Sequence, residues 1–268
     1  MSQWSRRKVG GLPVRNLSLP IFFGGISEEN QTSEIKEALK NTRYCSLTKT
    51  RTINLSCLAI KNLPINSLLA SIREESFTLN ERVDYEMVFT ETKIVLNLEG
   101  NLLETIPVEL FSALNIQVIL LRSNKLQTIS SKIADLKSLQ TLTLSNNPIR
   151  YLPVEILSLP ITLFTISERH FLTDEEMDNM NSQVVFKETT LNELCLKNVM
   201  MDDILSIRGT AINKPQGECY GCRSLTTSTN LVFKKIEYKG ICIPFAMRVC
   251  SVECKDKCLS PGETPNVV

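Results

Sequence analysis

The sequence lacks most of the features on which an enzyme or a membrane protein is built. Only one of its 268 residues is a histidine, His170, so mechanisms and metal sites that need two histidines are excluded. It contains no glycine-rich phosphate loop, no dinucleotide-binding glycine pattern and no G-x-S-x-G nucleophile motif. No run of about 18 uncharged apolar residues is present either. We therefore expect a protein that is not an enzyme and does not cross a membrane.

The chain also lacks an excess of charge and a signal for secretion. Thirty basic residues balance 29 acidic ones, so nothing in the net charge of +1 draws the chain to nucleic acid. The apolar stretch Leu17 to Phe23 is interrupted by Ser18 and Pro20, and it is too short for a signal peptide. Nine cysteines are present, an odd number, and six of them lie after residue 218. In a reducing compartment such a cluster binds metal more often than it forms disulfides. We expect a cytoplasmic or nuclear protein.

A repeat of constant length occupies the middle of the chain. It consists of Leu96-x-Leu98-x-x-Asn101-x-Leu103, Ile119-x-Leu121-x-x-Asn124-x-Leu126 and Leu142-x-Leu144-x-x-Asn147-x-Ile149, with successive asparagines 23 residues apart. The second half of each unit keeps the same step, at Ile106-Pro107, Ile129-Ser130 and Leu152-Pro153. A fixed period between about 20 and 50 residues indicates stacked coils, because one coil cannot bury its own apolar side.

These units resemble the 23-residue form of the leucine-rich repeat. The resemblance implies an α/β repeat solenoid, a horseshoe in which each coil contributes a short strand and the asparagine amide binds the backbone at the bend. Upstream, Ile53-x-Leu55-x-x-Leu58-x-Ile60 fits the template with leucine in the asparagine position. Residues 71–92 then form either a distorted coil, which we favour, or an insertion. Downstream, Phe164-x-Ile166 continues the strand pattern before the repeat ends.

The resemblance also implies that side chains between the inward leucines line a concave surface that binds partners. We expect a protein partner there, because the positions are polar with little net charge. The candidate residues are Asn97, Glu99, Leu120, Arg122, Thr143 and Ser145, flanked by Asn54, Ser56, Thr165 and Ser167.

Two helix starts follow the repeat. Thr173 and Thr190 each precede a glutamate by three residues, the pattern of a capping box. The apolar side chains after Thr190 predict a helix that covers the open end of the repeat. As an alternative, Leu191, Cys195 and Val199 resemble the elongin C-binding box of ubiquitin-ligase substrate receptors. That resemblance implies a helix docked in a groove of elongin C, although residues 200–213 lack the proline of the usual cullin-contacting segment.

The strongest chemical signal is C-x2-C-x27-C-x3-C, formed by Cys219, Cys222, Cys250 and Cys254. Four thiolates at this spacing are suited to a structural zinc ion. Between the pairs, alternating apolar residues on both sides of Gly240 predict a hairpin. The Cys-x-x-Cys turn at Cys219 and Cys222, the hairpin and the Cys-Ser-x-x-Cys helix start together resemble a treble-clef zinc finger. Cys258, one helical turn after Cys254, is the alternate fourth ligand.

The sequence thus predicts a leucine-rich-repeat horseshoe with a small zinc-stabilised α+β module at its C-terminal end. The expected parts are an N-terminal arm and capping helix (1–45), the repeats (46–170), a helical cap (171–212), the cysteine-rich module (213–260) and a disordered tail (261–268). We expect an interaction adaptor, with two alternatives: an elongin C-dependent substrate receptor, or a nucleic-acid-associated factor that works through the zinc module.

Overall fold

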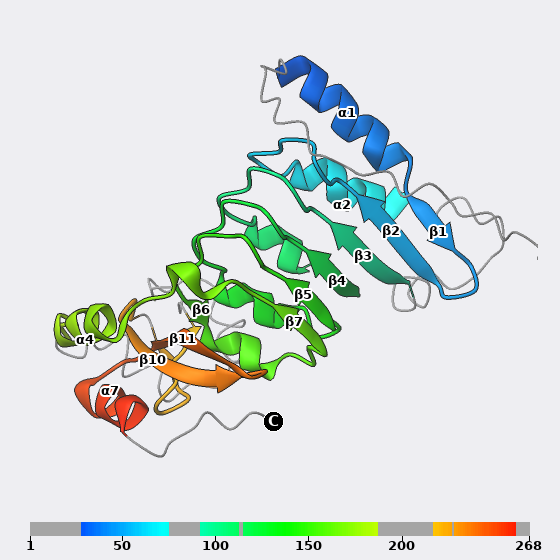
Figure 1. Ribbon diagram of the computed structural model, residues 1–268. Coiled ribbons are helices and arrows are strands. Elements are labelled where there is room, and N and C mark those ends of the chain that lie inside the picture. The colour runs from blue at the N-terminus through cyan, green and yellow to red at the C-terminus, as the bar shows by residue number, and fades with distance from the viewer. Residues whose placement is uncertain (1–27, 75–91, 113–114, 187–216, 227, 261–268) are drawn as a thin grey trace, which may run out of the picture.

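A computed structural model describes residues 28–74, 92–112, 115–186, 217–226 and 228–260. Its centre is a six-stranded sheet whose strand order follows the chain (Figure 1). The strands are β1 (Arg43–Cys45), β2 (Thr50–Asn54), β3 (Lys93–Asn97), β4 (Ile116–Leu120), β5 (Thr141–Thr143) and β7 (Leu163–Thr165). Strands β2 to β7 are parallel to their neighbours, and β1 forms an antiparallel edge on β2. The predicted stack of coils, one strand for each coil, is present.

Short helices lie on the opposite side of each coil from the sheet. They are α2 (Ile65–Glu74) and the 3-10 helices η2 (Val108–Ser112), η3 (Ser131–Asp135) and η4 (Val154–Ser158). The core lies between the two layers, where Leu96, Leu98, Leu121 and Leu144 are fully buried. Successive side chains of a strand point to opposite faces, so the alternation of the repeat sends every second residue into this core.

The asparagines of the repeat connect neighbouring coils. The Asn124 amide donates from Nδ2 to the carbonyls of Leu98 and Leu121, at 2.9 and 3.0 Å, and its Oδ1 accepts from the Leu103 N–H at 3.1 Å. Asn101 and Asn147 make the same contacts one coil earlier and one coil later. All three side chains are buried. A bend that buries backbone groups needs such partners, since an unpaired buried amide is costly.

The first coil keeps its fold although Leu58 replaces the asparagine. The Oδ1 atom of Asn101, in the next coil, accepts from the N–H groups of Leu58 and Ile60 at 3.1 and 3.0 Å. Strand β2 pairs directly with β3, from Thr50 opposite Lys93 to Asn54 opposite Asn97. No coil made of residues 71–92 therefore stands between these strands. The expectation of a distorted coil between these strands is therefore wrong. Residues 75–91 lie outside the described residues.

The N-terminal end of the repeat is covered by α1 (Glu28–Lys40), which packs on α2 and β2. Ile35 and Leu39 of this helix are buried in the same core as the leucines of the first coils. This helix lies within the segment 1–45, where the sequence predicts a capping helix. The part of the expected N-terminal arm before residue 28 lies outside the described residues.

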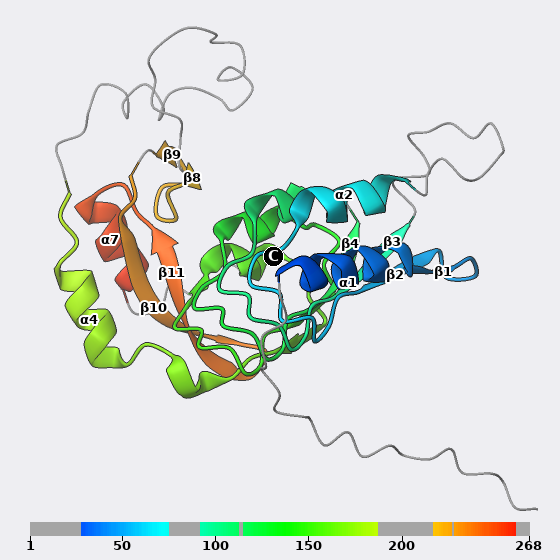
Figure 2. The same ribbon diagram turned by 90° about the horizontal axis from the view of Figure 1, so that it is seen from above.

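The cysteine module packs on the other end of the repeat (Figures 1 and 2). It contains β8 (Gly217–Glu218), β9 (Leu225–Thr226), the hairpin β10 (Leu231–Tyr238) and β11 (Ile241–Arg248), and α7 (Val252–Leu259). The turn residues Lys239 and Gly240 both have positive φ, at 54° and 77°, as a two-residue hairpin turn requires. The hairpin predicted from the alternation around Gly240 is thus confirmed.

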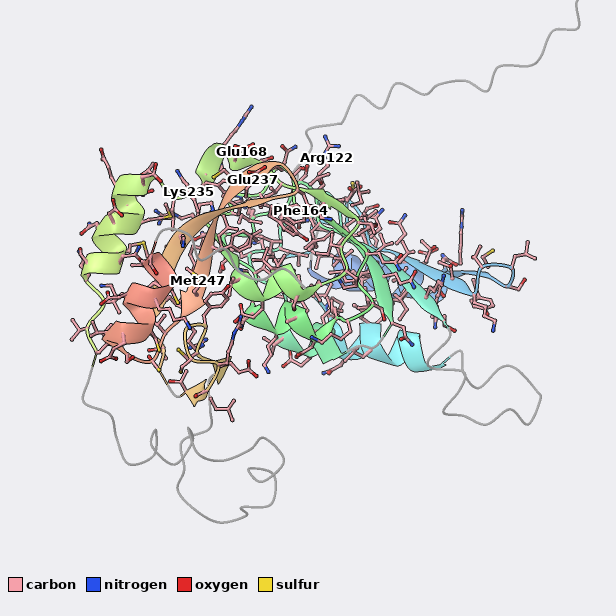
Figure 3. The ribbon with its side chains drawn as sticks, turned by 90° about the horizontal axis from the view of Figure 1, so that it is seen from below. Arg122, Phe164, Glu168, Lys235, Glu237 and Met247 are labelled. Atoms are coloured by element: carbon pink, nitrogen blue, oxygen red, sulfur yellow. The ribbon has the colours of Figure 1, made fainter. Side chains whose placement is uncertain are left out.

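The hairpin is joined to the repeat by strand pairing and by aromatic contacts. Strand β11 runs parallel to β6 (Leu152–Pro153) of the last coil, with Phe245 opposite Leu152. Phe164 of β7 lies beside the tip of the hairpin (Figure 3). Its ring meets that of Tyr238 edge to face, with the ring centroids 5.4 Å apart, within the range of about 4.5–7 Å typical of such pairs. Leucines of the repeat and apolar residues of the module share one hydrophobic core. The module is an integral layer on the last coil.

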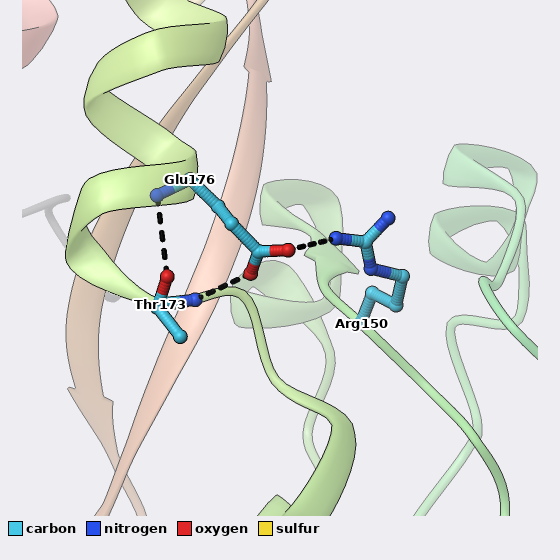
Figure 4. A network of polar contacts seen from close by, with 3 residues as sticks. All are labelled: Arg150, Thr173 and Glu176. Atoms are coloured by element: carbon cyan, nitrogen blue, oxygen red, sulfur yellow. Dashed lines mark hydrogen bonds and ion pairs between the residues drawn. The ribbon is translucent and has the colours of Figure 1, made fainter.

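The helix α4 (Asp174–Ser182) covers the outer face of the hairpin. It begins with the predicted capping box: the Thr173 hydroxyl accepts from the Glu176 N–H, and the Glu176 carboxylate accepts from the Thr173 N–H and pairs with Arg150 at 2.7 Å (Figure 4). Near its end, the buried Asn181 amide donates to the carbonyl of Phe233 and accepts from its N–H, both at 2.8 Å. This side chain thus pairs with β10 as a neighbouring strand would. The helix expected after Thr190 lies outside the described residues.

Among the described residues, none of the helices combines the length and the apolar character needed to cross a membrane.

The asparagine contacts lead to a first prediction. Replacing Asn124 with Ala leaves the buried Leu103 N–H without its acceptor, whereas the carbonyls of Leu98 and Leu121 keep Asn101 and Asn147 as donors. We expect a loss of about 1–3 kcal/mol in the free energy of unfolding, measured by urea denaturation. The exposed Gln127→Ala in the same coil is the control and should change stability by less than about 0.5 kcal/mol. Equal effects of the two substitutions would show that the buried amide is dispensable.

Candidate metal centre and concave surface

Four cysteine side chains from two separate segments meet at the far end of the module. Cys219 and Cys222 lie in the turn between β8 and β9, and Cys250 and Cys254 flank the start of α7. All four Sγ atoms lie within 4.8 Å of one another. Cys250 Sγ is 3.6 Å from that of Cys222 and 3.7 Å from that of Cys254. A tetrahedral ion with metal–sulfur bonds of about 2.3 Å places its sulfurs about 3.8 Å apart. The group can therefore hold a metal ion.

Backbone hydrogen bonds shape the turn that presents the first two thiols. The Cys219 N–H donates to the Ser224 carbonyl, and the Arg223 N–H donates back to the Cys219 carbonyl, both at 2.8 Å. The Tyr220 N–H donates to the Arg248 carbonyl at the end of β11, also at 2.8 Å. The turn is thereby fixed to the hairpin next to Cys250.

Gly221 lets this turn approach α7 closely. A Cβ atom on Gly221 would lie 2.7 Å from Cβ, 2.9 Å from Cα and 3.0 Å from the carbonyl oxygen of Cys254. Two of these three atoms belong to the helix backbone, which cannot rotate away. On the helix side, Ser251 is the N-cap, and its hydroxyl accepts from the Cys254 N–H. The predicted Cys-Ser-x-x-Cys helix start is therefore confirmed.

The thiols differ in their tendency to ionise. Burial acts to raise the pKa of Cys222, but hydrogen bonds from Ser224, Cys250 and Cys219 outweigh it and lower the pKa to about 6. Burial raises the pKa of both Cys250 and Cys254, and interactions with the neighbouring Cys219 raise both further. Crowded thiols resist sharing several negative charges, whereas a bound divalent cation favours their thiolate forms. The electrostatics of the group thus suit a cation better than four free thiols.

Basic side chains of the module make local contacts. Lys257 donates to the Gly221 carbonyl at 3.3 Å, and Arg223 stacks over the Tyr220 ring at 4.6 Å. The others are Arg248 with the Ser228 carbonyl, Lys234 with the Cys258 and Ser260 carbonyls, Lys255 with the Asn181 carbonyl, Lys235 with the Asp174 carboxylate and Lys239 over the Tyr238 ring. In these contacts Lys235 meets a carboxylate, and the other basic side chains meet carbonyl oxygens or aromatic rings.

The remaining cysteines are placed apart from the four. Cys258, the alternate ligand, is buried one turn further along α7 and is not among the side chains brought together within the described residues. Cys45, Cys57 and Cys242 are exposed on other elements. The candidate elongin C contacts Leu191, Cys195 and Val199 lie outside the described residues, so that interaction stays a prediction.

The six candidate partner-binding residues lie in two rows across the sheet. Asn97, Leu120 and Thr143 are opposite one another in β3, β4 and β5. Glu99, Arg122 and Ser145 follow two positions later in each chain segment, on the same face. Arg122 is exposed and the other five are half-buried, so all six are accessible on this face of the sheet, which the resemblance makes the concave surface.

A third row on this surface was missed by the sequence interpretation. Thr52, Val95, Val118, Thr141 and Leu163 are opposite one another in five successive strands. The first four are half-buried, and Leu163 is 53% exposed. Together with Leu120, the two valines form an apolar centre between polar side chains. The signal was present in the sequence, since each of these residues directly precedes the first inward apolar residue of its coil.

The fold defines the class of the protein: a repeat protein built of coils that each add one parallel strand. The comparisons identify the repeat itself. Residues 95–149 match the leucine-rich repeat family, which confirms the prediction that these coils are leucine-rich repeats. Repeats of this family generally mediate protein–protein interactions and are typically not enzymes.

One similar solved structure is that of a leucine-rich-repeat protein from Leptospira interrogans. It is 26% identical in sequence, the match covers 49% of this chain and 34% of that chain, and the TM-score is 0.32. The match thus spans about a third of the length of that protein. No curated protein matches the chain.

The close contact at Gly221 provides a test of the metal centre. In Gly221→Ala the new methyl group pushes the turn away from α7 and separates the two cysteine pairs. We expect a loss of about 1–3 kcal/mol in stability and a lower content of bound metal after dialysis. Gly240→Ala is the matched control: a Cβ there meets nothing within 4 Å, so only the positive φ costs about 1–2 kcal/mol. Metal content, measured by elemental analysis, should fall only in Gly221→Ala, and unchanged content there would contradict the assignment.

Proposed function

We propose that the chain is a non-catalytic adaptor that binds a protein partner on its concave surface. The observation that carries this proposal is the row of Val95 and Val118 next to Leu120, half-buried and open to solvent at the centre of the sheet. Protein interfaces commonly have such an apolar centre within a polar rim. Asn97, Thr143, Glu99 and Arg122 supply that rim here.

The charge of the surface supports a protein partner over a nucleic acid. The second row contains one acidic side chain, Glu99, beside one basic side chain, Arg122, and otherwise serines. Nucleic-acid binding needs several lysines or arginines on one face. The basic residues of the cysteine module, the alternative contact for nucleic acid, are held in the local contacts described above.

We further propose that the metal held by the four cysteines is a structural zinc ion. Four thiolates leave no position open for water or substrate, which is the arrangement of structural zinc sites. The ion would link the β8–β9 turn to α7, two segments of a module with few residues of its own. Cys219, Cys222, Cys250 and Cys254 are the ligands.

A reducing compartment, the cytoplasm or the nucleus, fits both proposals. The eight cysteines within the described residues are free of disulfides, including four close enough to bind one ion. Oxidising compartments would favour disulfides in such a group.

Substitutions in the apolar centre test the adaptor proposal. Val118→Asp and Leu120→Asp each place a charge where a partner must exclude water, so we expect at least a tenfold loss of captured partner, equivalent to about 1.4 kcal/mol. The measurement is affinity purification with quantitative mass spectrometry. Lys132→Glu on η3, at the opposite side of the coil, is the control and should retain the partner. Circular dichroism confirms that each variant is folded. A partner retained by both concave variants would remove this surface from consideration.

Metal analysis tests the zinc proposal. Protein purified under reducing conditions without chelator should contain one zinc ion for each chain. Cys219→Ser removes a buried ligand and should abolish zinc retention, whereas Cys242→Ser, on the exposed side of β11, should leave it unchanged. Zinc-free wild-type protein would refute the proposal.

A further inference from the structure

The four clustered thiols are not equally accessible. Cys219 and Cys254 are buried, at 0% and 9% exposure, whereas Cys250 is half-buried and Cys222 is exposed. The two accessible thiols are also neighbours, with their Sγ atoms 3.6 Å apart. A small oxidant therefore reaches one pair of the cluster from solvent and has no comparable access to the other.

We propose that Cys222 and Cys250 form an oxidation site, which hydroperoxides convert to a disulfide with release of the metal ion. The Cys222 thiolate attacks the terminal oxygen of the hydroperoxide, the O–O bond breaks, and a sulfenic acid and a hydroxide or alkoxide form. The Cys250 thiolate then attacks the Cys222 sulfur, the S–O bond breaks and hydroxide leaves. Two protons from water neutralise the leaving oxygens. In total the two thiolates lose two electrons, and the hydroperoxide gains them.

Other pairs of cysteines are less able to form a disulfide because of where they lie. Cys250 and Cys254 are almost as close, at 3.7 Å, but Cys254 lies behind Gly221, whose Cα hydrogens face the Cys254 backbone. Cys242 is exposed, but it lies near the start of β11, and the strand runs about 20 Å from there, at about 3.3 Å for each residue, before it ends at Arg248 beside the cluster. Cys45 lies in β1 and Cys57 in the first coil, both at the opposite end of the repeat.

Disulfide formation removes two of the four ligands. The remaining thiols, Cys219 and Cys254, cannot complete a tetrahedral site, so the ion leaves. The disulfide keeps the β8–β9 turn attached to the end of β11, whereas α7 loses the link that Cys254 provided. The pairing of β11 with β6 lies several residues away and does not use the thiols. Oxidation therefore loosens α7 and leaves the concave surface in place.

The test is peroxide treatment of the full chain, followed by peptide mapping without reduction. Zinc content is measured first, because the metal belongs to the function proposed above and the two proposals must be tested separately. We expect a Cys222–Cys250 linkage as the main product, release of one zinc ion for each chain into a colorimetric chelator, and recovery after thiol reduction with added zinc. Cys242→Ser should behave as the wild type in every readout.

The outcomes separate the two proposals. If the purified chain contains no zinc and still forms the Cys222–Cys250 linkage, the zinc proposal is refuted and the proposed oxidation site is supported. A different linkage, or irreversible oxidation of Cys222 without any linkage, would overturn the oxidation proposal whether or not zinc is present. Because this mapping is done on the wild-type chain, the result does not depend on a cysteine variant that fails to fold. Hydrogen exchange should rise in α7 and stay unchanged in β3 and β4, and the reverse pattern would contradict the proposed consequence.

Discussion

Each asparagine amide of the repeat satisfies the backbone of two coils at once, and the rest of the structure depends on this contact. Asn124 holds the carbonyls of Leu98 and Leu121 together, so its own coil cannot shift against the previous one without losing buried hydrogen bonds. The constant step of 23 residues follows from this requirement. The registered strands then align every second side chain into rows, and those rows form the concave surface.

Local sequence patterns predicted two kinds of element. The first are those that contact residues close by in the chain, and the second are those that repeat at a constant spacing. The alternation around Gly240 gave the hairpin, Thr173 and Ser251 gave two helix starts, and the asparagine spacing gave the stack. The four cysteines that the structure brings together are also the four that the spacing selected. In each case a short-range rule of backbone or ligand geometry determines the result.

Contacts between distant segments were not predicted. The pairing of β11 with β6 joins residues that are about 90 positions apart, and nothing in either strand alone specifies the other. The two-residue strand Leu152–Pro153 is too short to give a periodic signal. The direct pairing of β2 with β3 was also missed, because the long connection between them resembles a coil in length. Val95 and Val118 precede the first inward apolar residue of their coils, so the pattern of residues between the inward leucines does not include them.

The arrangement explains how the two candidate sites can serve one molecule without interfering. The apolar centre lies on β3 and β4, where Asn101 and Asn124 hold the coils on both sides. The cysteines lie beyond the last coil, and they reach the repeat through β11 and the contact of Tyr238 with Phe164. A metal ion held by these four cysteines would therefore lie at the end of the stack, beyond the last coil that the structure describes. The concave surface needs no ion of its own, because its shape is set by hydrogen bonds within the repeat.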